Sequence, residues 1–245
     1  PAPCPPGSLT MDSDGPRAPS RSSGQKGARS RAPLFAALDL GTNNCRMLIA
    51  APDRENGLRV VDGYSRIVRL GEGLTHTGRL SDEAMARAYQ ALTACAQRIE
   101  ARAPVAVGCV ATQACRSASN GQIFLNRIRT DLGLDFEIIS SEEEAQLAVL
   151  GCASLIEPEP EVTLIVDIGG GSTELSWVRP KDVLANPLEA PILAWGTAPL
   201  GVVTLAEEEE EPAAGKQAWY EALVERLAVQ IASVGDAAHL RAAFE

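Results

Sequence analysis

Histidine is scarce in this 245-residue chain, which contains only His76 and His239. A catalytic mechanism built on an imidazole group therefore has little support. A P-loop is also missing, because no stretch matches the glycine-rich loop with the lysine and hydroxyl residue that this motif requires. These absences argue against histidine-centred catalysis and against P-loop phosphoryl transfer.

Long apolar runs and paired cysteines are missing as well. No apolar run approaches the roughly 20 residues that a membrane-spanning helix needs, so no membrane association is expected. The six cysteines form no CxxC pair and show no spacing typical of metal ligands. Because they are scattered, mostly in apolar contexts, we expect reduced core cysteines in a cytoplasmic protein.

The net charge of −10 argues against a protein that binds nucleic acid polymers. Residues 1–33 differ from the rest, because they are rich in Pro, Ser, Gly and Arg and show no hydrophobic periodicity. We predict that this segment is disordered. The whole chain is 45% apolar, and its length is enough for one or two domains with a sizeable core.

The most informative stretch is VTLIVDIGGGSTEL at residues 162–175. An apolar run ends in Asp167, three glycines follow, and a second apolar run begins after Ser172 and Thr173, which predicts a strand, a turn and a strand. A triple glycine lets the backbone approach a ligand and turn several N–H groups toward one anion. Asp167 can then hold Mg²⁺ or a water beside that anion. The alternative is a tight hairpin in which the aspartate only caps the turn, because it would have the same sequence pattern.

The same pattern occurs earlier in the chain. An apolar run at 34–38 leads to Asp39, Gly41 and small polar residues, and a second apolar run follows at 45–50. Asp39 and Asp167 lie 128 residues apart in matching contexts. We therefore predict two related domains, each of which presents one hairpin to a shared cleft.

Arg116 follows a predicted buried strand at residues 105–111. Loops beyond the carboxyl ends of strands are where open α/β sheets bind ligands. Since a guanidinium group binds phosphate in a bidentate manner, Arg116 is a candidate phosphate clamp. The alternative is an ordinary surface charge.

A helix is predicted from about residue 140 to about residue 155. Ser141 and Glu144, three residues apart, have the spacing of a capping box at the start of this helix. The alternative is that a carboxylate at this helix end activates water as a general base. The sequence pattern alone leaves both interpretations open.

Five segments of the chain resemble the exopolyphosphatase/guanosine pentaphosphate phosphatase family over residues 34–206. They are LDLGTNN at 38–44, ATQACR at 111–116, IISSEEEA at 138–145, VDIGGGSTEL at 166–175 and PLG at 199–201. The resemblance implies an α/β fold with two ribonuclease H-like domains of the actin and sugar-kinase superfamily. These domains would span residues 34–147 and 148–245, with the active site in the cleft between them.

The resemblance also implies roles for individual residues. Glu144 would be the catalytic base, and Asp167 together with Asp39 would position Mg²⁺. The phosphate-binding residues would be Asn43, Arg116, Gly169, Gly170, Gly171, Ser172 and Thr173. The chain departs from the family at Gln146, where an arginine is usual, and this removes a possible partner for phosphate. It also contains no later Ser-Gly-Thr loop, so the second domain is expected to be incomplete.

The function implied is that of a Mg²⁺-dependent phosphohydrolase that removes terminal phosphate from a phosphoanhydride chain. Its substrate would be inorganic polyphosphate or guanosine pentaphosphate, which would connect it with the stringent response. The resemblance is compatible with a homodimer of the full-length protein. Two other interpretations stay open, namely a phosphotransferase of the same superfamily and a non-catalytic protein that binds a guanosine alarmone.

Overall fold

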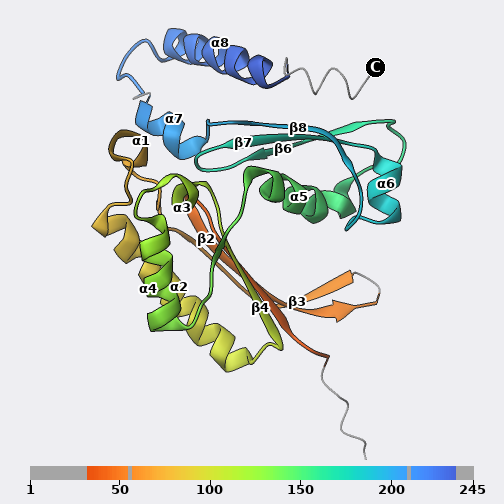
Figure 1. The fold of residues 1–245 in the computed structure, drawn as a ribbon. Coiled ribbons are helices and arrows are strands. Elements are labelled where there is room, and N and C mark those ends of the chain that lie inside the picture. Colours follow the sequence, from red (N-terminus) through yellow and green to blue (C-terminus); the bar gives the residue numbers. More distant parts are fainter. Residues whose placement is uncertain (1–31, 55–56, 209–210, 236–245) are drawn as a thin grey trace, which may run out of the picture. The chain divides into compact units, whose positions relative to one another are not determined.

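A computed structural model describes residues 32–54, 57–208 and 211–235, which belong to one compact unit that begins at Ala32. The predicted disordered segment at 1–33 lies almost wholly outside the described residues. The elements in chain order are β1 (Phe35–Leu40), β2 (Asn44–Asp53), β3 (Gly57–Ile67), α1 (Leu74–Thr77), α2 (Asp82–Arg102), β4 (Ala106–Ala111), α3 (Gln113–Ser117), α4 (Gly121–Leu132), β5 (Glu137–Ile138), α5 (Ser141–Cys152), η1 (Ala153–Leu155), β6 (Thr163–Ile168), β7 (Thr173–Val178), α6 (Pro180–Ala185), β8 (Ile192–Ala198), α7 (Val202–Glu208) and α8 (Lys216–Gly235) (Figure 1).

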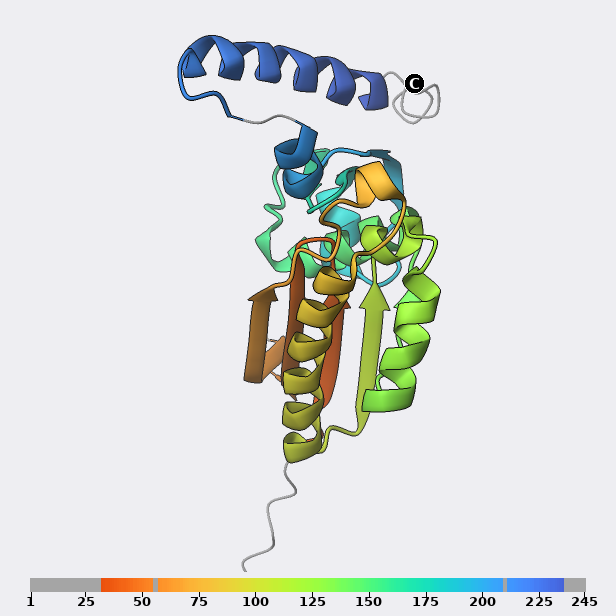
Figure 2. The same ribbon diagram turned by 90° about the vertical axis from the view of Figure 1, so that its left-hand side faces the viewer.

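The first sheet has five strands in the order β3-β2-β1-β4-β5. Its central strand β1 pairs with β2 in antiparallel and with β4 in parallel. Helices α2 and α4 lie on one face of this sheet (Figure 2). Alternate residues of β1 point to that face and are buried, as the period of two in a strand requires: Ala36, Leu38 and Leu40.

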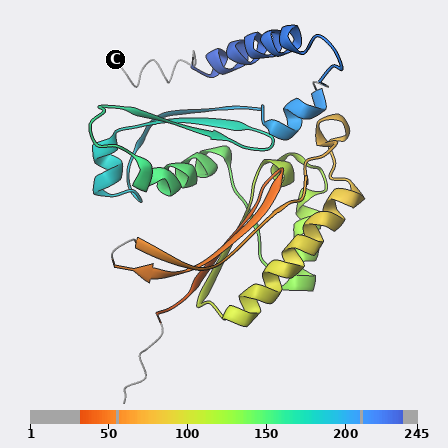
Figure 3. The same ribbon diagram turned by 180° about the vertical axis from the view of Figure 1, so that it is seen from behind.

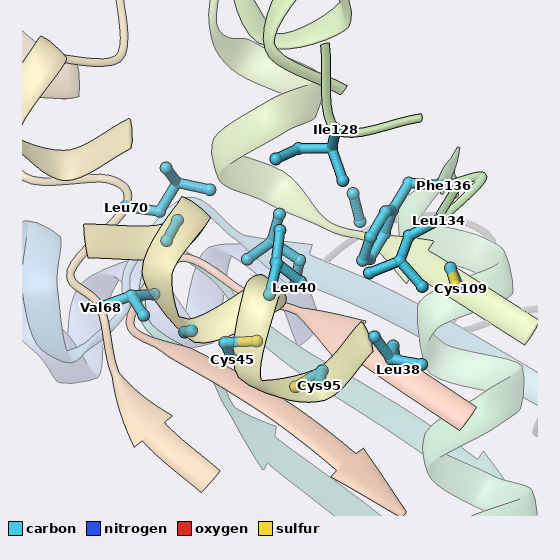
Figure 4. Packing of buried hydrophobic residues seen from close by; sticks show 14 of the residues in the cluster. Leu38, Leu40, Cys45, Val68, Leu70, Cys95, Cys109, Ile128, Leu134 and Phe136 are labelled. Atoms are coloured by element: carbon cyan, nitrogen blue, oxygen red, sulfur yellow. The ribbon is translucent and has the colours of Figure 1, made fainter. Parts of the chain in front are cut away.

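The core of this layer lies directly beneath the first hairpin turn. Leu40 at the end of β1 and Cys45 at the start of β2 are fully buried. They belong to one apolar cluster with Cys95 of α2 and Ile128 of α4 (Figure 4). Packing on both sides of the turn fixes where the intervening loop at residues 41–44 can go.

The second sheet has three strands in the order β6-β7-β8, and its first hairpin repeats the geometry of β1–β2. In the β1–β2 hairpin the Gly41 N–H donates to the Asn44 carbonyl at 2.9 Å, and in the β6–β7 hairpin the Gly169 N–H donates to the Ser172 carbonyl at 2.9 Å. The cross-strand register is also the same, since Asp39 faces Arg46 and Asp167 faces Glu174. The internal repeat seen in the sequence is therefore a repeat of backbone structure.

The two hairpins differ in what covers them. Ala36, Leu38 and Leu40 of β1 are 6%, 2% and 0% exposed. Their counterparts in β6 are much more exposed: Leu164 at 45%, Val166 at 49% and Ile168 at 64%. Within the described residues, β6 pairs only with β7, and no strand takes the place that β4 has beside β1.

Helix α5 joins the two sheets and packs on the second one. Its Val149 belongs to a small apolar cluster with Ile165 of β6, Val178 of β7 and Val183 of α6. The expected domain boundary after residue 147 falls inside α5 and stays a prediction. In the part of the chain that the structure describes, no helix is long and apolar enough to cross a bilayer.

Candidate active site

The turns of the two hairpins lie next to each other (Figures 1 and 3). They border a cavity of about 130 Å³. Residues from both hairpins line it, together with the starts of three helices, α3, α5 and α7. The lining residues are Asp39, Gly41, Thr42, Asn43, Asn44, Arg46, Thr112, Gln113, Glu144, Asp167, Ile168, Gly169, Gly170, Gly171, Ser172 and Val202. The cavity thus contains most of the residues that the sequence pattern singled out.

Close approach of the two loops depends on glycine. A Cβ atom at Gly170 would lie 2.8 Å from the backbone nitrogen of Asn43 and 2.9 Å from the Cβ of Thr42. At Gly171 a Cβ atom would lie 1.7 Å from Oε1 of Gln113, and at Gly201 it would lie 2.3 Å from the carbonyl carbon of Gly170. A side chain at Gly170 or Gly201 would have to displace backbone atoms, whereas at Gly171 it would first displace the Gln113 side chain.

The glycine loop is held through its carbonyl groups. The carbonyls of Gly169 and Gly170 accept hydrogen bonds from the N–H groups of Val202 at 3.0 Å and Val203 at 2.8 Å, at the start of α7. No acceptor among the described residues takes the N–H groups of Gly170 or Gly171. A loop fixed by its carbonyls, with N–H groups left over beside a cavity, is suited to bind an anion.

Asp39 and Asp167 approach the cavity from equivalent positions of β1 and β6. Burial raises the pKa of Asp39, the Arg46 guanidinium lowers it, and the Asp167 carboxylate raises it. The charge of Asp167 thus reaches Asp39, and both residues line the same cavity.

Glu174 is a third acidic group here, and the sequence analysis did not identify it. It faces Asp167 across the hairpin, is 2% exposed, and accepts a hydrogen bond from Thr197 Oγ1 at 3.0 Å. Burial raises its pKa; a hydrogen bond from Ser172 is the largest opposing effect. A charged residue inside the predicted buried strand β7 was the signal that would have found it.

The predicted capping box of Ser141 and Glu144 is wrong, because the N-cap of α5 is Ser140 and not Ser141. Ser140 is the N-cap, and its Oγ accepts from the Glu143 N–H at 3.1 Å while the Ser140 N–H donates to Glu143 Oε2 at 2.8 Å. Glu143 completes this box. Glu144 is therefore free for another role, which removes the interpretation that competed with a catalytic one.

Glu144 lines the cavity opposite the glycine loop. Burial, followed by the Glu174 carboxylate and then Asp39, raises the pKa of Glu144 to about 7, against the opposing charge of Arg116. A carboxylate with a pKa near neutral is matched to accept a proton from water at physiological pH. Glu144 thus has the position and the basicity expected of a general base.

Arg116 lies in α3, immediately after β4, but it is not one of the residues that line the cavity. Its guanidinium donates to the Ile139 carbonyl at 2.6 Å, to Ser141 Oγ at 3.0 Å and to Glu144 Oε2 at 3.3 Å. Its predicted role as a phosphate clamp stays a prediction.

The other expected site residues divide into two groups. Asn43, Gly169, Gly170, Gly171 and Ser172 line the cavity. Thr173 does not, because it begins β7 and its Oγ1 donates to the Leu200 carbonyl at 2.6 Å. Gln146 is exposed on α5 and also does not line the cavity.

Arg46 is a further lining residue that the sequence analysis did not identify. Of the residues that line the cavity, it alone carries a positive side chain. Arg46 stands seven residues after Asp39, as Glu174 stands seven residues after Asp167. This spacing places each residue across the hairpin from its aspartate and could have been read from the repeat.

The donor set is compatible with Mg²⁺. Among the described residues no group of three or more His, Cys, Asp or Glu side chains is arranged to hold a metal. Two carboxylates at one cavity fit an ion that keeps several waters and binds substrate phosphate oxygens, which is how Mg²⁺ is usually held. Asp39 and Asp167 are those carboxylates.

Comparisons with known proteins agree with this architecture. A model of the Ppx/GppA phosphatase family matches residues 48–223. A crystal structure of an exopolyphosphatase-like protein is 32% identical with a TM-score of 0.71, and the match covers 83% of this chain and 61% of that one. A Ppx/GppA family member from Aquifex aeolicus is 28% identical with a TM-score of 0.59, over 79% of this chain and 61% of that one.

An exopolyphosphatase from Cytophaga hutchinsonii shares the fold at 24% identity, with a TM-score of 0.69 and coverage of 83% of this chain and 63% of that one. The predicted α/β fold class is confirmed. The chain spans less than two thirds of the length of these solved structures.

Proposed function

Because the chain belongs to the Ppx/GppA phosphatase family, we propose that it carries the active site of a phosphohydrolase. The reaction is release of terminal phosphate from a phosphoanhydride chain. The observation that carries this proposal is the position of Glu144, a carboxylate of raised pKa that shares one cavity with the free N–H groups of Gly170 and Gly171.

The glycine loop binds and orients the terminal phosphate. The N–H groups of Gly170 and Gly171 donate to its oxygens, and Asn43 of the first hairpin, which lies beside Gly170, contributes to the same cavity. These donors are held by the backbone, so they need no reorganisation when charge develops in the transition state. The Arg46 guanidinium adds a positive charge at the same cavity.

Glu144 activates the attacking water. The water oxygen forms a bond to the terminal phosphorus while the P–O bond to the rest of the chain breaks, and the Glu144 carboxylate accepts the proton that the water loses. The products are free phosphate and the shortened chain, and Glu144 then releases its proton to solvent. Its raised pKa makes this transfer favourable near neutral pH. The neighbouring carboxylates of Glu174 and Asp39 make the Glu144 carboxylate more basic.

Asp39 and Asp167 would hold Mg²⁺ at this cavity. When bound, the ion neutralises charge on the phosphate oxygens and makes the phosphorus more reactive. The two aspartates come from repeated hairpins and line one cavity, so each hairpin would contribute one ligand.

The expected substrate is inorganic polyphosphate, with guanosine pentaphosphate as the alternative. The similar structures include an exopolyphosphatase-like protein and an exopolyphosphatase, which supports a linear polyphosphate. Both compounds end in the same phosphoanhydride group, and the residues of the cavity would bind that group. We also propose a cytoplasmic location, and a homodimer of the full-length protein.

The test is phosphate release by the full-length protein that contains this chain. The protein is incubated with Mg²⁺ and either polyphosphate or guanosine pentaphosphate, and Glu144→Gln serves as the catalytically impaired control. Phosphate release that requires Glu144 supports the proposal and identifies the substrate. Binding of guanosine pentaphosphate without phosphate release would instead indicate an alarmone-binding protein. Phosphate that appears only on an added acceptor would indicate a phosphotransferase.

A further inference from the structure

We propose that Arg116 is a positioning residue, which fixes the Glu144 carboxylate at the edge of the cavity and leaves phosphate binding to the two loops. The inference rests on the proposed function, in which Glu144 is the general base. It assigns Arg116 a role different from the phosphate clamp that the sequence resemblance implies.

The Arg116 side chain connects α3 to the start of α5 through hydrogen bonds. One guanidinium nitrogen donates to the Ile139 carbonyl at 2.6 Å, just before α5 begins. The other terminal nitrogen donates to Ser141 Oγ at 3.0 Å, in the first turn of the helix. Both nitrogens donate to the same oxygen of Glu144, each at 3.3 Å. A planar guanidinium that is held by the Ile139 carbonyl and the Ser141 hydroxyl can fix the orientation of the Glu144 carboxylate.

Glu144 has no other hydrogen-bond donor among the described residues. The neighbouring Glu143 is satisfied by the capping box with Ser140, so capping does not restrain Glu144. The side chains of Arg116 and Glu144 are 25% and 19% exposed, which leaves limited solvent to compete for this pair. Without Arg116 the carboxylate would lose its only fixed contact in this part of the chain.

The charged groups around Glu144 act in opposite directions. Glu174 of β7 and Asp39 of β1 both disfavour a second negative charge at Glu144, whereas Arg116 of α3 favours it. Removing Arg116 would therefore raise the pKa of Glu144 further and release its side chain from the cavity edge. The loss of a residue that bound only phosphate would appear mainly in KM.

The contacts also argue against direct binding of substrate by Arg116. The residue does not line the cavity, and its terminal nitrogens are engaged with Ile139, Ser141 and Glu144. Binding phosphate would require breaking the ion pair with the base. Arg46 already places a guanidinium at the cavity.

The first test compares Arg116→Gln and Arg116→Lys with wild type in the full-length protein, using polyphosphate and Mg²⁺. For Arg116→Gln we expect kcat to fall on the order of 10- to 100-fold while KM changes by less than about twofold, and the midpoint of kcat/KM against pH to move up. Arg116→Lys should restore the pH midpoint of kcat/KM, because it keeps the positive charge. It should recover kcat only in part, because an ammonium group lacks the planar arrangement of N–H donors of a guanidinium group. Arg127→Gln, which removes an exposed ion pair with Asp131, is the matched control and should leave all three values unchanged.

A clamp gives the opposite pattern. If Arg116→Gln raises KM about tenfold or more with kcat and the pH midpoint unchanged, Arg116 binds phosphate and the inference is overturned. Values equal to those of Arg127→Gln would show that Arg116 is only a surface charge, which also overturns it.

A second measurement does not depend on activity. The pKa of the Glu144 carboxyl is measured by carbon NMR of glutamate-labelled protein, with Glu144→Gln used to assign the signal. Arg116→Gln should raise this pKa, and Ser141→Ala, which removes one anchor of the guanidinium, should raise it less. An unchanged pKa in a folded Arg116→Gln protein overturns the inference. Failure of the wild type to release phosphate would overturn only the proposed function, since the NMR result decides the positioning role separately.

Discussion

Asp39 and Asp167 occupy the same position in two copies of one hairpin and face a single cavity. The strand register, the loop length and the closing hydrogen bond are the same in both copies. Their cross-strand partners are opposite in charge, Arg46 in the first hairpin and Glu174 in the second. The duplicated backbone therefore carries an asymmetric set of charges, of which Arg46 lines the cavity and Glu174 is buried behind it.

The metal site can be tested at Asp167. Asp167→Ala should abolish phosphate release and weaken Mg²⁺-dependent binding of polyphosphate, because it removes a hard oxygen ligand from the cavity. Binding is measured by calorimetry with and without Mg²⁺. Asp131→Ala, a change on α4 outside the cavity lining, is the control. Turnover of Asp167→Ala at the wild-type rate would show that the cation, if required, is held elsewhere.

Glycine 170 is predicted to be intolerant of any side chain. Gly170→Ala would place a Cβ atom 2.8 Å from the Asn43 nitrogen, so the loops must separate, at a cost of about 1–3 kcal/mol. Gly108→Ala in β4 is the matched control, because nothing lies within 4 Å of its added Cβ. Thermal unfolding should show a lower Tm for the first variant and little change for the second. Equal Tm values and equal phosphate release would argue against tight contact between the two loops.

The identity of the base is tested with a pair of neighbouring residues. Glu144→Gln keeps the shape of the side chain but removes the proton acceptor, so turnover should fall by roughly 10²–10⁴-fold while substrate binding changes little. Glu143→Gln is the control, since glutamine can still complete the capping box with Ser140 and the loss of stability should be on the order of 0.5 kcal/mol. Equal turnover in the two variants would require a different base.

The pH dependence of turnover follows from the same residue. Because burial raises the pKa of Glu144 to about 7 and only the ionised carboxylate accepts a proton, kcat/KM should rise with pH and level off above neutrality. The profile is measured at saturating Mg²⁺ between about pH 5 and pH 9. A rise centred near the ordinary glutamate pKa of 4.5 would contradict this environment for Glu144.

Stability should respond to pH in the opposite direction. The pKa of Glu144 is higher in the folded protein than the ordinary value of 4.5, so its contribution to stability is fully present below that pH and is lost as the pH rises through about 7. The Glu144→Gln protein does not lose stability in this way, because glutamine does not ionise. The difference in unfolding free energy between variant and wild type, measured in denaturant at several pH values, should therefore shift in favour of the variant as the pH rises. A constant difference would show that the carboxyl is not destabilised by burial.

The uncovered face of β6 predicts self-association of a protein that consists of residues 1–245 alone. Leu164 and Val166 are 45% and 49% exposed, whereas Ala36 and Leu38 at the equivalent positions are buried. We expect such a protein to aggregate and to show little phosphate release. Leu164→Thr with Val166→Thr should reduce association on a sizing column, and Val105→Thr, at an isolated exposed position, should not. A monodisperse, active 1–245 protein would contradict this expectation.

The sequence by itself determined the hairpins, their repetition and the family. Each signal is contiguous: an apolar strand, an aspartate, glycines and a second apolar strand, all within about 14 residues. Local backbone preference and strand periodicity are enough to predict such a unit. The position of Asp167 and of the glycines at the cavity followed from that pattern.

Only the tertiary structure decided the surroundings of Glu144. The start of α5 at Ser141, with Ser140 as its cap, moves the capping box by one residue, and neighbouring serines cannot reveal this from their order. The pairing of Glu144 with Arg116 joins residues 28 positions apart, and the burial of Glu174 beside Asp167 depends on the β6–β7 register. Charge interactions and close packing act through space, so their partners are set when the sheets and helices come together.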